Sequence, residues 1–486
     1  MRFSSRARSA MAGLAVFLLA LNGCGSNPAT GGQSLLGMSE EQEIQLSKEE
    51  HPKILAEFGG EVKDPALQNY ITSIGTLLAK TSERPNLPWK FTILDTPDVN
   101  AFALPGGYIY ITRGLLGLAS SEAEVASVLG HEIGHVTARH TSQRQGRATI
   151  AGLGAALAGI LTGSSAVAQL GNTLATGYIQ KYSRDQELQA DTLGVRYMSR
   201  ANYDPQASVQ FLEKLLDESR LAAEEAGKDP SEADQVTWTS SHPRTTDRVQ
   251  QAIKNAGVID VSNPIVEHDL YLSKIDGLVY GDDPEQGIVR GRTFIHPGLR
   301  LQFQVPQGFR IINQPSQVIA QSQEGDGVMA FGQAKVSGSL TDWFENHPKA
   351  RFENIDRIDV NGMEGATGVT QGAVNNQRAD LRVVLIRYDA DTVYQFMFAT
   401  PPGSEGKYDR PFRETTYSFR KLSAAEASQA KPQRIKVVTV GANDSVTSLA
   451  QRMNVDDLAE ERFRVLNGLA EGHGRLQPGE KVKIIQ

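Results

Sequence analysis

Apolar side chains recur at three- and four-residue spacings over much of the first 260 residues. That period is typical of helices that bury one face and expose the other. One helix is expected to begin at Ser121, because residues 121–124 have the S-x-x-E form of a capping box and a periodic apolar run follows them. Further helices are expected at about 39–57, 65–81, 187–199, 205–221 and 245–256.

The pattern changes at about residue 265. From there to about residue 422, apolar and polar residues alternate in short runs, for example at 381–388 and 392–399. Alternation with a period of two predicts strands, here in a mainly antiparallel sheet. The fold class is therefore α+β. A mainly helical domain with a small edge sheet is expected over 39–262, and a β-rich α+β module over 265–422.

Residues 148–180 carry no charged side chain. A hairpin that dips into a membrane is one interpretation of this run. However, Gly163, Ser164 and Ser165 interrupt it, whereas a membrane span needs about 20 unbroken apolar residues. We therefore favour packed helices that cover a cleft.

The N-terminal segment has the features of a secretory signal. Arg2, Arg6 and Arg8 precede an apolar run over 11–21 that is too short to span a membrane. The run ends at a sequence that resembles a bacterial lipoprotein box, in which Cys24 is acylated. The resemblance implies a signal peptide over 1–23 and a tether to the membrane over 24–38. Gly25, where inner-membrane lipoproteins have aspartate, favours the periplasmic face of the outer membrane.

Composition narrows the class of function. The chain has 49 Lys and Arg against 56 Asp and Glu, a formal net charge of −7 and no basic stripe, so nucleic-acid binding is not expected. Cys24 is the only cysteine, which leaves no disulfide and no free thiol once it is acylated. A length of 486 residues predicts about three domains.

The stretch from His131 to His135 is the strongest chemical signal in the chain, because it reads H-E-x-x-H within the helix that begins at Ser121. Residues four apart share a helix face, so His131 and His135 can offer two imidazole nitrogens to one metal ion. Glu132 would then stand close enough to act on a metal-bound water, as in zinc hydrolases. The alternative is two surface histidines on an amphipathic helix, but the apolar periodicity places them on a half-buried one.

A catalytic zinc needs a third protein ligand and an open position. The metzincin spacing is excluded, because Ala138 and Thr141 stand where glycine and the third histidine are required. Glu187 and Asp191 lie four apart after a second capping-box pattern, at 183–186, and therefore share one helix face. Glu187 is the candidate ligand, and Asp191 the candidate acceptor for the free ring N–H of a ligand histidine. The alternative is a solvated acidic face.

Four motifs together resemble the gluzincin peptidase family of the CAAX prenyl endopeptidases and HtpX proteases, in particular its periplasmic, outer-membrane quality-control branch. In order along the chain they are 100–115, 131–135, 184–191, and 241–243 with Arg248. The resemblance covers about residues 35–260. It implies that Glu187 is the third ligand of one zinc ion per chain and that Glu132 is the general base.

Two further residues are candidates for the catalytic site. His242 and Arg248 are the side chains that the sequence offers to stabilise the oxyanion of an acyl-transfer intermediate. Pro243 holds His242 in an extended conformation that suits a loop side chain directed into a cleft. His242 has a second interpretation, in which it occupies the open position of the zinc and keeps the enzyme latent. In a third interpretation, His242 and Pro243 form an ordinary turn at the start of the helix that carries Arg248.

Substrate binding is predicted for the strand Tyr108, Ile109 and Tyr110, which is rich in aromatic and β-branched residues. Pro105 precedes it, and proline favours the edge of a sheet. An edge strand beside a zinc site can pair with an extended peptide and read its backbone. The alternative is a plain core hairpin.

The C-terminal residues 435–486, which follow an Ala- and Ser-rich linker over 423–434, resemble a LysM module with a βααβ order. LysM modules bind the glycan of peptidoglycan. This copy departs from the pattern with which LysM modules usually begin. Glycine and aspartate normally adjoin there, but Ala442 and Asn443 separate Gly441 from Asp444. Glycan binding and a packing role without ligand are both left open.

These features predict a lipid-anchored zinc endopeptidase of the bacterial periplasm. Its expected substrates are unfolded or misassembled envelope proteins. Its other expected partners are the outer-membrane assembly machinery and, through residues 435–486, peptidoglycan. The alternative from another class is a chaperone or assembly scaffold with latent proteolysis; a cell-wall factor is a third. Glu132 argues against a scaffold, since a binding module has no use for a base.

Overall fold

The computed structural model describes residues 24–35, 37–145, 182–225, 227, 229–231, 246–374, 377–455, 457–469 and 475–486. The chain divides into two compact units. The first unit comprises Met1–Leu55, Glu61–Leu278 and Arg434–Gln486, and the second comprises Ala56–Gly60 and Val279–Gln433. Helices and sheets occur in both, so the α+β class is confirmed.

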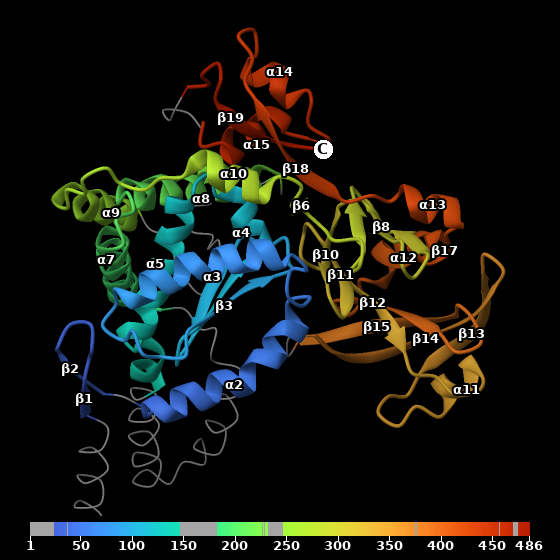
Figure 1. Cartoon of the computed structure of the whole chain (residues 1–486). Helices are drawn as coiled ribbons and strands as arrows, with labels where there is room; N and C mark the ends of the chain where they lie inside the picture. The colour runs from blue at the N-terminus through green and yellow to red at the C-terminus, as the bar shows by residue number, and fades with distance from the viewer. Residues whose placement is uncertain are drawn as a thin grey trace, which may run out of the picture. The chain divides into compact units, whose positions relative to one another are not determined.

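Helices dominate the first unit (Figure 1). They begin where the sequence provides caps: Asp64 accepts from the backbone N–H groups of Ala66 and Leu67, Ser121 from that of Glu124, and Ser183 forms the predicted capping box with Gln186. The helices are α2 (Glu40–Glu57), α3 (Pro65–Lys80), α4 (Arg113–Leu118), α5 (Glu122–Thr137), α7 (Arg184–Arg200), α8 (Gln206–Glu225), α9 (Thr246–Val258) and α10 (His268–Ile275).

A three-stranded sheet packs against these helices in the order β3 (Lys90–Leu94), β5 (Tyr108–Thr112), β4 (Ala101–Leu104). Strand β5 runs parallel to β3 and antiparallel to β4. The edge-strand prediction for Tyr108, Ile109 and Tyr110 is therefore wrong. Both backbone sides of β5 are already paired, so no peptide can be added there. The edges of this sheet are β3, which packs against α3, and β4, which packs against α5 and pairs with β5 alone in the described ranges.

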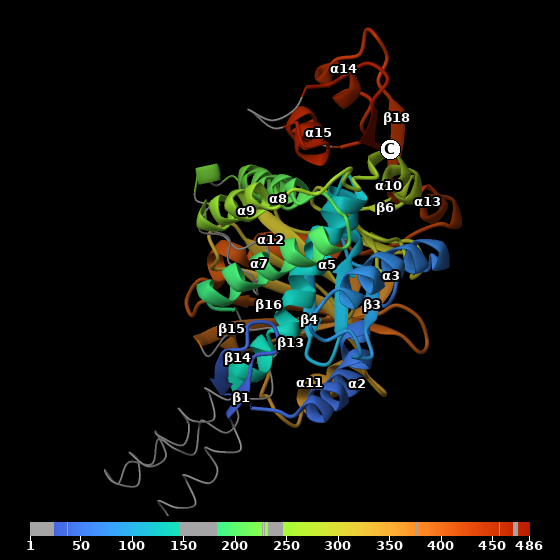
Figure 2. The ribbon, with the colours of Figure 1, turned by 60° about the vertical axis from the view of Figure 1, so that its left-hand side comes forward.

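Helices α5 and α7 cross at close range, and Figures 1 and 2 both show them side by side. Glycines make the approach possible. A Cβ on Gly194 would lie 2.9 Å from the backbone nitrogen of His131, and one on Gly134 would lie 3.0 Å from the carbonyl oxygen of Ala190. The crossing brings the face that carries His131 and His135 against the face that carries Glu187 and Asp191.

The second unit is built around an antiparallel seven-stranded sheet in the order β10-β11-β12-β16-β15-β14-β13. Helix α12 packs on it through Phe412, which stacks on Phe398 of the sheet at a centroid distance of 4.4 Å. The strands of this sheet are β10 (Phe309–Gln314), β11 (Gln317–Ser322), β12 (Val328–Ala334), β13 (Glu353–Val360), β14 (Met363–Val374), β15 (Gln377–Arg387) and β16 (Val393–Thr400). The other elements are β6 (Val279–Tyr280), β7 (Ile288–Arg290), β8 (Thr293–His296), β9 (Leu301–Gln304), β17 (Arg420–Lys421), α11 (Leu340–Glu345), α12 (Glu405–Ser418) and α13 (Ala424–Gln429).

The C-terminal segment has the element order predicted for it: β18 (Gln433–Thr439), α14 (Val446–Ala450), α15 (Ala459–Leu466) and β19 (Lys481–Ile485). Strands β18 and β19 are antiparallel, with Ile435 opposite Ile485. Two predicted connectors contain regular structure. Within the expected tether, β1 (Cys24–Ser26) pairs with β2 (Gln33–Leu35), and α13 lies within the expected linker.

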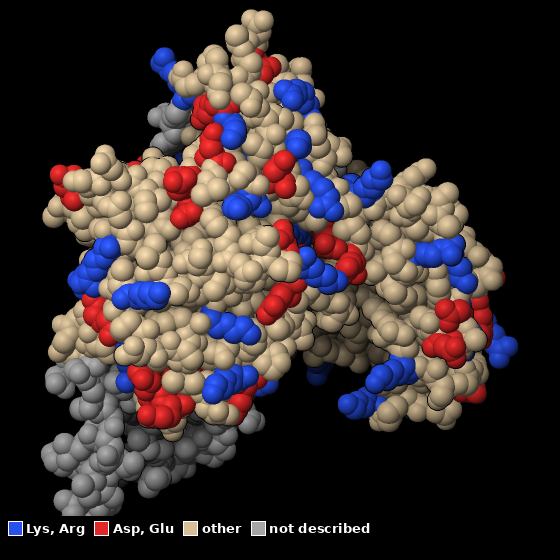
Figure 3. Space-filling view, viewed as in Figure 1, with Lys and Arg blue, Asp and Glu red and all other residues tan. Residues whose placement is uncertain are grey.

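Basic and acidic side chains are interspersed on the face shown in Figure 3. Among the described residues, no helix is both long enough and apolar enough to cross a membrane. The uncharged run at 148–180 lies outside the described residues, as does the expected signal peptide at 1–23.

Candidate metal centre

Three side chains predicted as ligands converge where α5 crosses α7. The Nε2 atoms of His131 and His135 lie 3.0 Å apart, and each is 3.5 Å from a carboxylate oxygen of Glu187. The three ligand atoms all lie within 4.8 Å of one another. Glu187 is 0% exposed and His135 2% exposed, so the cluster is shielded from bulk solvent.

The outer ring nitrogens of both histidines are already engaged. The Nδ1 of His131 lies 2.8 Å from Asp191 Oδ1, as predicted. The Nδ1 of His135 lies 2.8 Å from Nδ1 of His140, whose Nε2 in turn lies 2.7 Å from the amide oxygen of Gln189. Because an amide oxygen only accepts, His140 donates through Nε2 and accepts through Nδ1 from His135.

This hydrogen-bond order fixes the chemistry of the centre. With N–H groups directed at Asp191 and His140, the Nε2 atom of each histidine can present a lone pair to a metal ion that takes the place of a proton there. Two lone pairs and the Glu187 carboxylate then face one point in a buried site, which is stable only around a cation. The donor set of two imidazoles and one carboxylate fits a divalent metal of the zinc type.

The titration of the cluster shows that its carboxylates favour a positive charge at this point, either a proton on His131 Nε2 or a metal ion that replaces it. Burial lowers the pKa of His131, but hydrogen bonds to Asp191 and Glu187 outweigh that effect and raise the pKa to about 9. Burial lowers the pKa of His140 to about 4, so its ring is neutral, as its two hydrogen bonds require. Burial alone would raise the pKa of Asp191, yet Arg248 and His131 lower it overall. Asp191 is therefore an ionised partner for His131.

Arg248 reaches the centre, but its geometry differs from the expected oxyanion role. Its Nε and Nη2 donate to the two oxygens of Asp191 at 2.8 and 2.7 Å, and its Nη1 lies 3.0 Å from Glu187 Oε2. A buried guanidinium committed to two carboxylates is not available to a substrate oxyanion. Arg248 is better described as a positioning residue that holds Glu187 and Asp191.

Glu132 lines a cavity that reaches the cluster. The cavity is also lined by His131, Asp191 and Arg248, and Glu132 itself is 1% exposed. Most of the remaining lining is apolar: Val128, Val195, Phe211, Leu212, Leu215 and Ala252. A carboxylate thus stands beside the candidate ligands at the wall of a largely apolar chamber.

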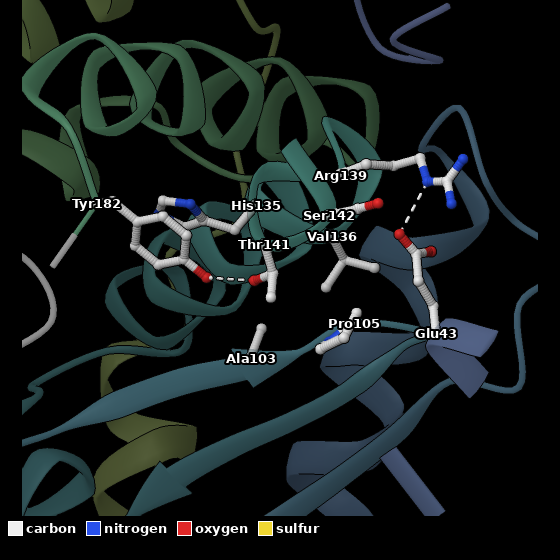
Figure 4. A pocket seen from close by; sticks show the side chains of 9 residues that line it. All are labelled: Glu43, Ala103, Pro105, His135, Val136, Arg139, Thr141, Ser142 and Tyr182. Atoms are coloured by element: carbon white, nitrogen blue, oxygen red, sulfur yellow. Dashed lines mark hydrogen bonds and ion pairs between the residues drawn. The ribbon is translucent and has the colours of Figure 1, made fainter. Parts of the chain in front are cut away.

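A second cavity lies on the His135 side of the cluster, between the end of β4 and the residues that follow α5 (Figure 4). Ala103 and Pro105 line one wall. Tyr182 lines another and stacks on the His135 ring at a centroid distance of 3.8 Å. The edge strand β4 therefore borders the same imidazole that is a candidate ligand.

Sequence reasoning missed His140 and Tyr182. His140 lies beyond the end of α5, where Arg139 has a left-handed φ of 57° and turns the chain back toward His135. The buried carboxylate of Glu43 holds that turn, because it lies 2.8 Å from Nε of Arg139. The sequence shows a histidine five residues after His135, but the direction of its side chain depends on the contact between Arg139 and Glu43 of the distant helix α2. His242 and Pro243 lie outside the described residues.

The comparisons with known proteins agree with this geometry. Residues 65–256 match peptidase family M48. A putative beta-barrel assembly-enhancing protease of Vibrio cholerae serotype O1 is 35% identical over 205 residues, which is 40% of each chain. The beta-barrel assembly-enhancing protease of Escherichia coli strain K12 is 32% identical over 44% of each chain. The mitochondrial metalloendopeptidase OMA1 of Arabidopsis thaliana is 35% identical over 28% of each chain.

These matches cover only part of each chain. The chain spans 40–44% of the length of these two bacterial relatives. The aligned part includes the helices that carry the cluster, since α5, α7 and α9 all begin within 65–256. The match and the converging ligand set together identify residues 65–256 as a metallopeptidase domain of family M48.

Proposed function

We propose that this chain is a zinc-dependent endopeptidase whose zinc is held by His131, His135 and Glu187. The observation that carries the proposal is the convergence of two Nε2 atoms and a buried carboxylate beside Glu132. When bound, zinc would lower the pKa of a water molecule and polarise the scissile carbonyl.

The chain's own residues divide the remaining work. Glu132 would accept a proton through its carboxylate and return it to the leaving amine, which is the role of a general base and acid. Asp191 and His140 orient the two imidazoles through their Nδ1 atoms, and Arg248 fixes both acidic residues of α7. A water-excluded setting strengthens each of these electrostatic interactions.

The two cavities indicate an extended and partly apolar substrate. Strand β4 has a free backbone edge among the described residues and borders the His135 cavity, so an extended peptide can pair with it. The apolar lining beside Glu132 suits a hydrophobic side chain of that peptide. Unfolded proteins expose both features, whereas folded proteins bury them. The proposed substrates are therefore unfolded or misassembled proteins.

The location proposed for this activity is the bacterial cell envelope. The lipoprotein-like sequence at Cys24 supports a lipid anchor in the outer membrane, facing the periplasm. The bacterial relatives are named for the enhancement of β-barrel assembly, which supports outer-membrane proteins as substrates and contact with their assembly machinery.

Digestion of an unfolded outer-membrane β-barrel protein tests this proposal. We expect the purified chain to cleave the unfolded protein, to leave the same protein intact once it is folded in detergent, and to lose activity with a chelator. Added zinc should restore the activity. Casein serves as an unfolded substrate unrelated to the envelope. Cleavage that persists in the chelator would contradict the zinc mechanism, and equal cleavage of folded and unfolded forms would contradict the substrate class.

A further inference from the structure

The last strand of the chain is buried on both of its faces. Side chains alternate along a strand, so Val482 and Ile484 share one face of β19, and Lys483 and Ile485 share the other. All four are buried, and Lys483 is 0% exposed. A strand at the rim of a small independent module would leave one face in water. The second face of β19 is therefore covered by the rest of the first unit.

Lys483 makes its contacts at the end of α4. Its Nζ donates to the carbonyl oxygens of Gly117, Leu118 and Ala119 at 2.9, 2.9 and 2.6 Å. The last carbonyl groups of a helix have no partner within the helix, and burial without a donor is costly. Burial and the nearby Lys214 lower the pKa of Lys483, whereas Glu124 raises it. The three carbonyl acceptors match the three N–H donors of an ammonium group, so the geometry favours the charged form.

The segment that Lys483 holds leads directly into the helix that carries the candidate ligands. Residues 119–121 connect α4 to α5. From the opposite side, the ammonium group of Lys214 in α8 donates to Ser120 Oγ at 2.8 Å and to Glu124 at 2.8 and 2.9 Å. The start of α5 is thus fixed between two buried lysines, one from α8 and one from the C-terminal strand.

Further contacts surround this central one. Asp276, at the end of α10, accepts from Nζ of Lys436 and from the backbone N–H of Val437, both at 2.9 Å. Arg462 of α15 forms an ion pair with Glu225 of α8. Figure 1 shows α15 and β19, in red, beside α8 and α10, and α15 also contacts α4. The C-terminal segment therefore attaches to three helices of the peptidase.

The loop after α15 takes part in the same attachment. Asn467 accepts from the backbone N–H of Lys483 at 2.7 Å and donates to its carbonyl oxygen at 2.9 Å, which fixes the strand position that Lys483 occupies. A Cβ on Gly468 would lie 3.3 Å from Cε of Lys214. This side of the C-terminal segment therefore packs against α8 of the peptidase.

We propose that residues 434–486 act as an intramolecular clamp on the peptidase, and that Lys483 is a positioning residue that holds the α4–α5 corner and, through α5, the His131 and His135 face. The inference rests on the proposed function in one respect, the catalytic consequence. The structural part of the clamp stands on the contacts alone.

The test uses Lys483→Met in the full chain, because methionine keeps most of the volume but leaves three buried carbonyl groups without a donor. Hydrogen exchange over 113–125 should become faster than in the wild type. At matched zinc content, kcat on an unfolded substrate should fall by about tenfold to 10²-fold, the size expected from a small misplacement of reacting groups. KM should change little, because no substrate-facing residue is altered.

Arg452→Met is the matched control, because it removes a cation from an exposed position of the same segment. Its exchange and kcat should equal those of the wild type. If Lys483→Met does not fold, Asp276→Ala decides instead: it loosens an exposed part of the attachment, and the same pattern should appear at smaller size.

Three outcomes bear on the inference. Unchanged exchange over 113–125 would overturn the clamp. Faster exchange with unchanged kcat would overturn the positioning role, because Lys483 would then be purely structural. A wild type without zinc-dependent cleavage would contradict the proposed function, while the exchange comparison would still decide the clamp.

Discussion

The two candidate ligand histidines depend on different partners for their orientation. Asp191 lies on α7, four residues from Glu187, and helical spacing alone predicts that both face the same point. His140 follows the end of α5, and its position depends on the left-handed turn at Arg139 and on Glu43 of a distant helix. The first partner was therefore predictable from the sequence, and the second was not.

Removal of the carboxylate ligand should have a larger effect than removal of its neighbour. We expect Glu187→Ala to lose most of its zinc and some stability. Asp191→Ala should weaken zinc binding by roughly 10–100-fold, as the loss of an orienting partner does. Metal analysis and thermal unfolding of both variants provide the comparison. Asp185→Ala, an exposed acidic residue of the same helix, is the control. Full zinc occupancy and activity in Glu187→Ala would refute the ligand assignment.

His140 offers a separate test of the hydrogen-bond order. His140→Phe keeps a ring against Tyr182 but removes the acceptor for the His135 N–H group. We expect zinc affinity to fall by roughly 10–100-fold. Competition with a coloured chelator measures that affinity directly. An affinity equal to that of the wild type would show that His135 does not need this partner.

At the scale of elements, the helices were predicted well because their signals are local. The starts of α5 and α7 follow from Ser121 and Ser183, and their apolar periodicity follows from the face that they bury. The sheet was predicted less well. A sequence shows that residues 108–112 form a strand, but not which strands flank it. The parallel pairing with β3 and the antiparallel pairing with β4 make β5 the central strand, so the edges are β3 and β4.

The α5–α7 crossing should be sensitive to one added methyl group. A Cβ at Gly194 would lie 2.9 Å from the backbone of His131, so Gly194→Ala should push the two ligand-bearing helices apart. We expect a loss of about 1–3 kcal/mol in the free energy of unfolding, together with weaker zinc binding.

Gly257→Ala is the matched control for that change. Gly257 lies in α9, and a Cβ there would meet no atom within 4 Å. Alanine in an open helical position should leave stability unchanged or raise it by up to about 1 kcal/mol. Denaturant unfolding of both variants gives the comparison. Equal behaviour of the two variants would show that the crossing is not tightly packed.

At the scale of the whole molecule, the C-terminal segment returns to the first unit after the second unit intervenes. The order of its elements was predictable, because turn residues and alternating runs mark them. Its attachment was not. Lys483 stands in an alternating run that is typical of a strand with one solvated face, and only the tertiary structure shows that this face is buried.

Zinc should contribute to the stability of the peptidase, because its proposed ligands come from two helices that the metal would join. A ligand that binds only the folded state raises the free energy of unfolding by about 2.7 kcal/mol when it is about 100-fold above its Kd. We therefore expect a chelator to lower the Tm and added zinc to restore it. A Tm that is the same with and without chelator, in a sample shown to lose its zinc, would contradict this expectation.

The most direct test of the central claim is the turnover of Glu132→Gln at matched zinc content. Glutamine keeps the shape of the side chain but cannot accept the proton. The variant should hold about one zinc per chain, as the wild type should, and cleave an unfolded β-barrel protein roughly 10²–10⁴-fold more slowly. Cleavage at the wild-type rate by this variant would contradict the account, because the proposed catalysis would then proceed without its base.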